Sequence, residues 1–285
     1  MEPLADVTVA DLTRQLPGPF ASRELLRLGA RVVKIEPPGG DPTPEPWYGE
    51  LNRGKEILAW DARGEPPPAV LEQADVVLEG FRPGGFERLG VDLPETTVLC
   101  SITGFGDAGP RAAEAGHDLN YLAYAGVLAD TAPALPPVQI ADLAGGALAA
   151  VAEILAALLE RTRTGRGAHV VVSMTHNAHR LVAHRAGDDP GPRLLTGGVA
   201  CYRLYETADG RYLSVAALEP KFWQNLCALL ERPDLLDRAY EPELPELAAL
   251  FRTRTLNEWR GLLEGRDTCV APVLTVEEAS AELSR

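Results

Sequence analysis

Three residues far apart in the sequence have the side chains that general acid–base chemistry uses: His117, Asp142 and Glu219. His117 lies in "EAGHDLNYLAYAGVL", and Asp142 stands at the head of the Ala/Leu-rich stretch "ADLAGGALAAV". A neutral imidazole is the usual proton acceptor near neutral pH, and it needs a carboxylate to orient its other nitrogen. Glu219, in "AALEPKFW", is a candidate for that orienting group. A carboxylate stabilised as an anion at a helix N-terminus is suited to act as a base or a nucleophile.

Each of these residues also has a purely structural interpretation. An aspartate at a helix start caps exposed N–H groups, and His117 after Gly116 is equally typical of a loop histidine bonded to backbone. Glu219 is equally typical of a solvated strand end before a proline that opens a helix. The pair Gly145 and Gly146 costs helix stability, which is easier to explain if another backbone or a ligand approaches there.

Basic residues gather in the first third of a chain whose formal net charge is −14. In so acidic a protein they indicate a phosphate-bearing ligand, although scattered surface charge is an equally good explanation. No GxGxxG or GxxxxGK[ST] fingerprint is present. The residues are Lys34, Arg53, Lys55, Arg63, Arg82 and Arg88, each near a predicted strand end or loop.

No metal site is expected. His176 and His179 are spaced i, i+3 but lack the carboxylate of an HExxH motif. The 4 cysteines form no CxxC pair, which also argues against a disulfide framework.

The composition bounds the class of protein. A length of 285 residues suits one large domain or two smaller ones, and the net charge of −14 argues against nucleic-acid binding. The N-terminus shows no secretory signal, and the longest apolar stretch, 143–159, falls short of the roughly 20 residues of a membrane span. We therefore expect a soluble cytoplasmic protein without a membrane partner.

The elements that must position these residues alternate between strand and helix. Strands are predicted at "VTVADL", "ARVVKIEPP", "EILAWDA", "ADVVLEGF", "TTVLCSITGFG" and "AHVVVSM", and "VACYRLYETADGRYLSVAAL" reads as a hairpin. This order predicts an α/β fold with a large Rossmann-like parallel-sheet domain over residues 1–185. A linker is predicted over 186–198 and a smaller α+β domain, a hairpin with helices, over 199–285. Parallel sheets usually bind ligands where their strands end.

Several long motifs, in collinear order over nearly the whole chain, resemble the class III CoA-transferase and α-methylacyl-CoA racemase superfamily. They are "DLTRQLPGPFASRELLRLGARVVKIEPPGGDP", "NRGK", "DVVLEGFRPGGFERLG", "SITGFGDAGP", "AGHDLNYLAYAGVL", "IADLAGG" and "ADGRYLSVAALEPKFW". "AGHDLNYLA" and "EP" resemble the racemase branch most closely. The resemblance implies that His117 and Asp142 transfer protons and that Glu219 orients the imidazole.

The same resemblance implies an acyl-CoA thioester as substrate, no prosthetic group and a homodimer. Lys34 and Arg88 would meet the CoA phosphates, and Arg63 would lie near the adenosine end. An enolate formed during inversion needs N–H donors, for which the backbone amides from Asp142 to Ala144 are candidates.

Three functions stay open at this point. The leading one is a 2-methylacyl-CoA racemase (epimerase) that inverts C2 by two-base proton transfer. The second is a class III CoA-transferase with Asp142 as nucleophile. The third is a non-catalytic CoA-binding relative, because the printed chain ends at "VEEASAELSR", before the segment with which family members return to their large domain.

Overall fold

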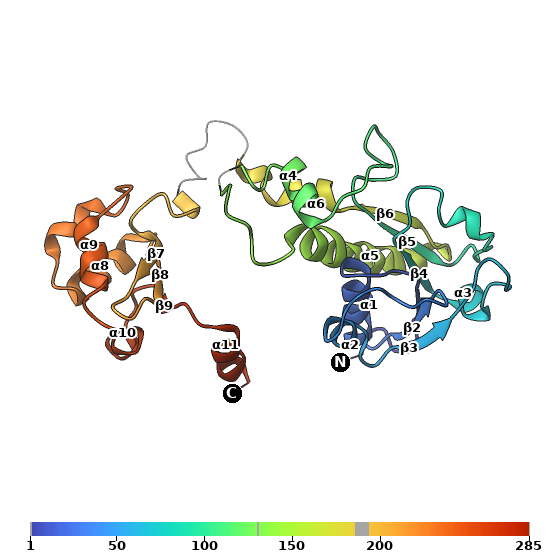
Figure 1. The fold of residues 1–285 in the computed structure, drawn as a ribbon, viewed down its shortest axis with the longest axis horizontal. Coiled ribbons are helices and arrows are strands. Elements are labelled where there is room, and N and C mark those ends of the chain that lie inside the picture. Colours follow the sequence, from blue (N-terminus) through green and yellow to red (C-terminus); the bar gives the residue numbers. More distant parts are fainter. Residues whose placement is uncertain (1, 130, 186–193, 285) are drawn as a thin grey trace. The chain divides into compact units, whose positions relative to one another are not determined.

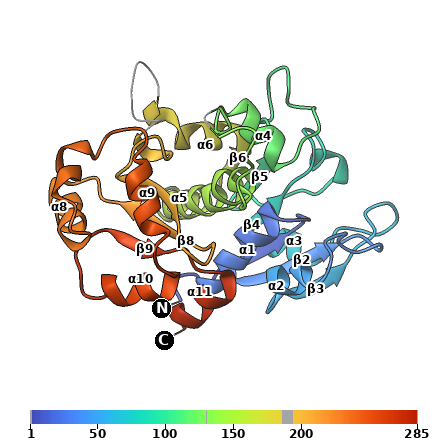
Figure 2. The same ribbon diagram turned by 60° about the vertical axis from the view of Figure 1, so that its left-hand side comes forward.

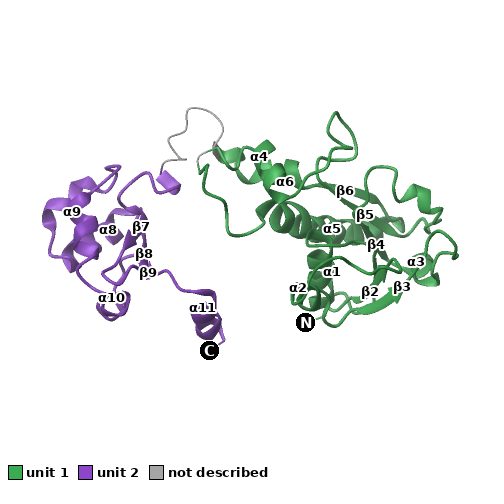
Figure 3. Ribbon diagram, in the orientation of Figure 1, with its two compact units in different colours: residues 1–184 green, residues 185–285 purple. Residues whose placement is uncertain are grey.

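The computed structural model describes residues 2–129, 131–185 and 194–284. The chain divides into two units, residues 1–184 and 185–285 (Figure 3). Most of the predicted linker, residues 186–193, lies outside the described residues.

The first unit is built on a six-stranded parallel sheet with the order β3-β2-β1-β4-β5-β6 (Figure 1). Short apolar, β-branched runs form its central strands because both faces of a doubly wound sheet are covered; Val9 pairs with both Val32 and Val76 and is fully buried. The strand order reverses between β1 and β4, which makes their carboxyl ends the topological switch point. The predicted α/β class is confirmed. The strands are β1 (Thr8–Asp11), β2 (Arg31–Glu36), β3 (Glu56–Ala59), β4 (Val76–Glu79), β5 (Val98–Thr103) and β6 (His169–Ser173).

Helices pack on both faces of this sheet (Figures 1 and 2). α1 (Pro17–Arg27) and the long helix that follows residue 140 share one core cluster with β1, β4 and β5. On the other face, α3 (Ala69–Gln73) and the neighbourhood of the short 3₁₀ helix η1 (Glu87–Leu89) pack on a second cluster. Three further helices complete the described part of the unit: α2 (Trp47–Asn52), α4 (Asp118–Tyr124) and α6 (Met174–Leu181), with a 3₁₀ turn η3 (Ala183–Arg185) at its end.

The long helix begins as a π-helix, η2 (Ala141–Leu148), and continues as α5 (Ala149–Thr164). A Cβ on Gly145 would lie 2.7 Å from the carbonyl oxygen of Met174, so the backbone of α6 occupies the space that glycine leaves. That close approach explains the glycine pair in the sequence.

The helix from Ala141 to Thr164 is also long and apolar enough to cross a membrane, by length and composition alone. The 17-residue apolar stretch of the sequence did not indicate this, because the helix extends beyond it at both ends. Its residues Ala150 and Ile154 are fully buried in the core of the first unit, which is typical of a core helix.

The second unit joins a small antiparallel sheet, in the order β7-β8-β9, to a group of helices. The predicted hairpin is confirmed: β7 (Tyr202–Glu206) and β8 (Tyr212–Ala216) flank a turn in which Gly210 has φ +71°. Trp223, Phe251 and Trp259 fill the core. The other elements are β9 (Val270–Pro272), α8 (Pro220–Leu229), the 3₁₀ helix η4 (Pro233–Arg238), α9 (Pro245–Phe251), α10 (Leu256–Leu263) and α11 (Val276–Leu283).

Candidate active site

Asp142 lies in the first turn of the π-helix, where the N-cap residue is Ile140, whose own side chain does not cap the helix. The Asp142 carboxyl group is partly buried, and within the described part of the chain no side chain donates a hydrogen bond to it. Burial and the nearby Asp118 charge raise the pKa of Asp142 from 3.8 to about 7. This direction is opposite to the expectation of a helix-stabilised anion, because burial disfavours the charged form of the carboxyl group.

His117 is the N-cap residue of α4, with an extended backbone at φ −127° and ψ 176°. Its N–H donates to Oδ1 of Asn120 at 3.1 Å, which fixes the start of the helix, while its side chain is exposed. The next residue, Asp118, accepts a hydrogen bond from the N–H of Asp142 at 3.0 Å. The two stretches singled out in the sequence thus meet through one hydrogen bond.

His117, Asp118 and Asp142 line a common cavity of about 500 Å³, here called the His–Asp cavity. The rest of its wall is mainly apolar, and none of the described residues that line it is a lysine or an arginine. The apolar members are Leu16, Pro42, Pro44, Trp47, Leu51, Leu119, Leu135 and Pro136. The cavity suits a neutral, apolar group and has both an imidazole and a carboxyl group in its wall.

The backbone amides proposed to stabilise an enolate are mostly occupied. The N–H of Asp142 donates to Asp118, and the N–H of Leu143 donates to the carbonyl of Gln139 at 2.9 Å. Both are therefore unavailable as oxyanion donors in this arrangement, which corrects that expectation for two of the three amides.

Glu219 belongs to the second unit, where it is the N-cap residue of α8 and precedes Pro220. Its carbonyl accepts from the N–H of Phe222 at 3.0 Å, and the residue is exposed. Its action on His117 stays a prediction.

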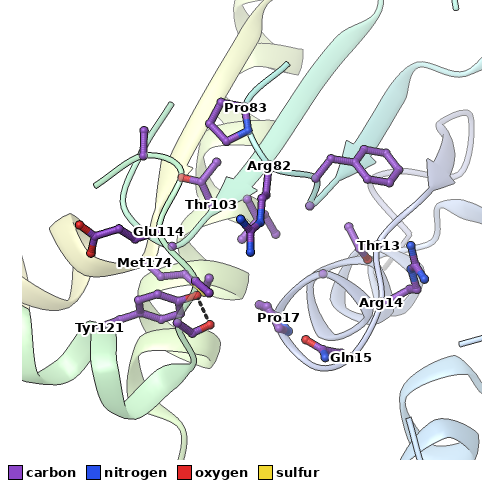
Figure 4. Close-up of a pocket in the computed structure, with 18 of the residues that line it drawn as sticks. Thr13, Arg14, Gln15, Pro17, Arg82, Pro83, Thr103, Glu114, Tyr121 and Met174 are labelled. Carbon is purple, nitrogen blue, oxygen red and sulfur yellow. Dashed lines mark hydrogen bonds between the residues drawn. The ribbon is translucent and has the colours of Figure 1, made fainter. Parts of the chain in front are cut away.

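A second cavity, of about 390 Å³, opens at the topological switch point, and we call it the switch-point cavity (Figure 4). Figure 4 shows the Arg82 side chain pointing into it, opposite Tyr121, whereas Glu114 points away. Arg82 donates to the carbonyl of Ala113 at 3.1 Å, which steadies the loop after β4. Gln15 lines both this cavity and the His–Asp cavity, so the two adjoin.

The loop that separates these cavities, residues 12–18, is anchored by a buried ionic network. Asp11, at the end of β1, is fully buried and accepts from the N–H of Thr13 at 2.9 Å, from Ser22 and from Lys55 at 3.3 Å. Burial opposes ionisation, but Lys55, Lys34 and the two hydroxyl groups hold the pKa of Asp11 below its ordinary value. Burial also lowers the pKa of Lys55 to about 8. This cation is part of the scaffold and is not exposed to a ligand.

The predicted phosphate-binding residues lie in different environments. Lys34 is fully buried, with its ammonium group 2.9 Å from Asp41 and 2.7 Å from the carbonyl of Thr13. The burial and pairing of Lys34 argue against the predicted contact with a phosphate, and Lys34 lines neither the His–Asp cavity nor the switch-point cavity. Arg88 is exposed on η1 beside Gly84, outside the described cavity walls.

Arg63 lines a third cavity, of about 660 Å³, at the ends of β2 and β3, here called the β2–β3 cavity. Arg14 lines both this cavity and the switch-point cavity. Sequence reasoning missed Arg14, although its position directly after β1 is a signal for a ligand-facing residue at a switch point. It also missed Asp118, which was visible only as the neighbour of His117.

The fold defines an α/β protein whose cavities open at the carboxyl edge of its parallel sheet, where such sheets usually bind ligands. A model of CoA-transferase family III matches residues 4–284, and the chain belongs to that family. It is 35% identical to human α-methylacyl-CoA racemase, over 96% of this chain and 78% of the relative. It is 28% identical to human succinyl-CoA:glutarate CoA-transferase, over 99% of this chain and 74% of that protein. Among solved structures, Rv3272 of Mycobacterium tuberculosis matches with a TM-score of 0.80 and 30% identity, over 100% of this chain and 87% of the other.

Proposed function

We propose that this protein is an acyl-CoA racemase (epimerase) that inverts the carbon next to the thioester of a 2-methylacyl-CoA. The observation that carries the proposal is the common cavity of His117 and Asp142. Two-base inversion needs one group on each side of the reacting carbon, one protonated and one not. A pKa of about 7 for Asp142 places its titration in the pH range where imidazole groups also change charge.

The proposed reaction conserves every bond of the substrate except one C–H bond. One of the two groups removes the proton from C2, and the electron pair of that bond moves into an enolate of the thioester. The other group, protonated beforehand, then donates its proton to the opposite face of C2. In one direction His117 is the base and Asp142 the acid, and in the other direction their roles are exchanged.

The cavities along the sheet edge support a long thioester substrate. The β2–β3 cavity and the switch-point cavity share Arg14, and the switch-point cavity and the His–Asp cavity share Gln15. We propose that the nucleotide end of CoA lies near Arg63 and Arg88, and that the acyl group enters the His–Asp cavity. The apolar wall without lysine or arginine supports an acyl chain that carries no second carboxylate.

Two parts of the proposal are supported by the family resemblance alone. Glu219 would orient the imidazole of His117, and the protein would form a homodimer. Light scattering on the protein eluted from a size-exclusion column tests the homodimer. Glu219→Gln tests whether Glu219 orients the imidazole of His117, and we expect it to lower kcat.

Proton exchange at C2 tests the function directly. Incubation of a small panel of 2-methylacyl-CoA esters in deuterated water should place deuterium at C2, read by mass spectrometry. His117→Asn should abolish inversion of C2 and the label in the enantiomer that His117 deprotonates, while His184→Asn, a substitution of the same kind at an exposed position outside the cavity, should leave both unchanged. Absence of label with every ester, from a protein that still binds CoA, would contradict the proposal.

A CoA-transferase is the second candidate, supported by the 28% identity to succinyl-CoA:glutarate CoA-transferase and by the position of Asp142 in a cavity wall. In that reaction the Asp142 carboxylate would attack the thioester carbonyl, expel CoA thiolate and form a mixed anhydride. A transferase should move CoA between two carboxylic acids, lose activity on Asp142→Ala and tolerate His117→Ala. The opposite dependence on His117 separates the two functions.

A further inference from the structure

The hydrogen bond between Asp118 and Asp142 has consequences for the proposed site. Asp118 is the first residue of α4 and follows His117 directly, whereas Asp142 lies 24 positions further along the chain. A hydrogen bond from the N–H of Asp142 to Oδ1 of Asp118, at 3.0 Å, links the two helix starts. The N–H groups of a first helical turn have no partner within their own helix, and for Asp142 the partner is a side chain from another element.

The charges around Asp142 are few. Of the elements packed against the π-helix, α4 presents Asp118 and Tyr121; burial raises the pKa of the Tyr121 phenol, and the charge of Asp142 acts in the same direction. Asp118 is the charged group that acts on Asp142. Further along the π-helix, Gly145 and Gly146 pack against Met174, Asn177 and Ala178 from α6 and Pro17 from α1, and His117 lines the same cavity as Asp142.

We propose that Asp118 is a positioning residue for proton transfer: its carboxylate holds the Asp142 helix start beside His117, and its negative charge opposes a second negative charge on Asp142. The inference rests on the proposed function. In a two-base site the negative charge of Asp118 has a specific role, because one of the two bases must carry a proton before each turnover. A lone carboxyl group with an ordinary pKa would be ionised at neutral pH and could not donate.

Two substitutions at Asp118 separate its two effects. Asp118→Asn keeps an oxygen acceptor for the N–H of Asp142 but removes the charge, and Asp118→Ala removes both. Asp107→Asn is the matched control, since Asp107 is an exposed loop carboxylate that lines none of the three cavities.

The readout is the pH dependence of C2 exchange for each enantiomer. For Asp118→Asn we expect the limb that reports Asp142 to move to lower pH by about one unit in both directions of the reaction, with a maximal kcat close to that of the unsubstituted protein. For Asp118→Ala we expect kcat to fall about tenfold or more at every pH with little change in KM, because the helix start is no longer held. The control should reproduce the original profile.

Two results would overturn the inference: profiles of Asp118→Asn and Asp118→Ala that both superimpose on the original, or equal losses in both variants with no shift in pH. A measurement without substrate keeps this test independent of the racemase proposal. Carbon-13 NMR of aspartate-labelled protein, with the Asp142 signal assigned by its absence in Asp142→Asn, should show its titration at lower pH in Asp118→Asn. If the unsubstituted protein exchanges no proton at C2, the proposed function fails, and the NMR titration alone decides the role of Asp118.

Discussion

Replacement of Asp142 by Asn should stabilise the protein in a pH-dependent way. The pKa of Asp142 rises from 3.8 in an unfolded chain to about 7 in the fold. Between these values the folded state binds more protons than the unfolded state, so the Asp142 carboxyl group lowers stability progressively as the pH rises from 3.8 to about 7 and fully above that. At about 1.4 kcal/mol for each pKa unit, the upper bound is about 4 kcal/mol.

Because the carboxyl group is only partly buried, solvent screens part of this penalty, and we expect Asp142→Asn to raise the free energy of unfolding by about 2 kcal/mol at pH 8. At pH 5 the gain should be clearly smaller, since the folded carboxyl group is then protonated and already neutral. Asn is close in shape to Asp, so the packing is preserved.

Hydrogen exchange of peptides from β4 and β5, read by mass spectrometry, reports the opening of the first unit alone. Asp107→Asn removes an exposed carboxylate from the same unit and serves as the control. A stabilisation of equal size at pH 5 and pH 8, or a loss of stability at pH 8, would refute the account of Asp142 as a buried, charge-opposed carboxyl group.

Three further substitutions test the scaffold and the ligand edge. Lys55→Met leaves the Asp11 carboxylate buried without its ammonium partner and should lower the free energy of unfolding at pH 7 by about 3–5 kcal/mol, measured by urea denaturation. Gly145→Ala drives a methyl group against the Met174 carbonyl and should cost about 1–3 kcal/mol, seen as a lower Tm. Arg63→Ala should weaken CoA binding about fivefold by calorimetry, with a shallower dependence on salt.

Matched variants show what each result means. Gly261→Ala, in α10, adds a methyl group where nothing lies within 4 Å and should leave Tm unchanged or slightly raised, in contrast to Gly145→Ala. Arg31→Ala removes a cation paired with Glu56 at the start of β2 and should not change CoA affinity. If Arg63→Ala and Arg31→Ala lose CoA affinity to the same extent, the CoA phosphates do not lie at Arg63. If Lys55→Met is as stable as the unsubstituted protein, Asp11 is neutral in the fold.

The fold could be predicted from sequence wherever burial dictates the residue type. The runs around Val9, Val32 and Val77 are β-branched because both faces of these strands are covered. Gly145 is a glycine because the backbone of Met174 approaches it closely. These signals are local, so a single sequence contains them. The alternation of strands and helices then restricts the topology to a few right-handed arrangements.

The candidate site was harder to predict because the presence of a charged residue in the sequence does not show whether its side chain is buried or exposed. Lys34 has the position of a ligand-binding cation at a strand end, yet Asp41, seven positions later, folds back and neutralises it. Asp142 reads as a helix cap, yet its helix begins one residue earlier as a π-helix, and its environment is set by Asp118 from another element. Such long-range pairings leave no periodic trace in the sequence.

Several structural features that lower the stability of the fold lie around the proposed reaction centre. Asp142 is a partly buried carboxyl group beside another carboxylate, it lies in the first turn of a π-helix, and Gln15 in the wall has a left-handed backbone at φ 68°. Each of these features costs free energy in an otherwise regular fold. The buried network of Asp11 and Lys55 lies directly beneath the same loop and fixes it. A fold that tolerates several unfavourable features in one cavity, and reinforces the loop that forms its wall, is better explained by chemistry carried out there than by packing alone.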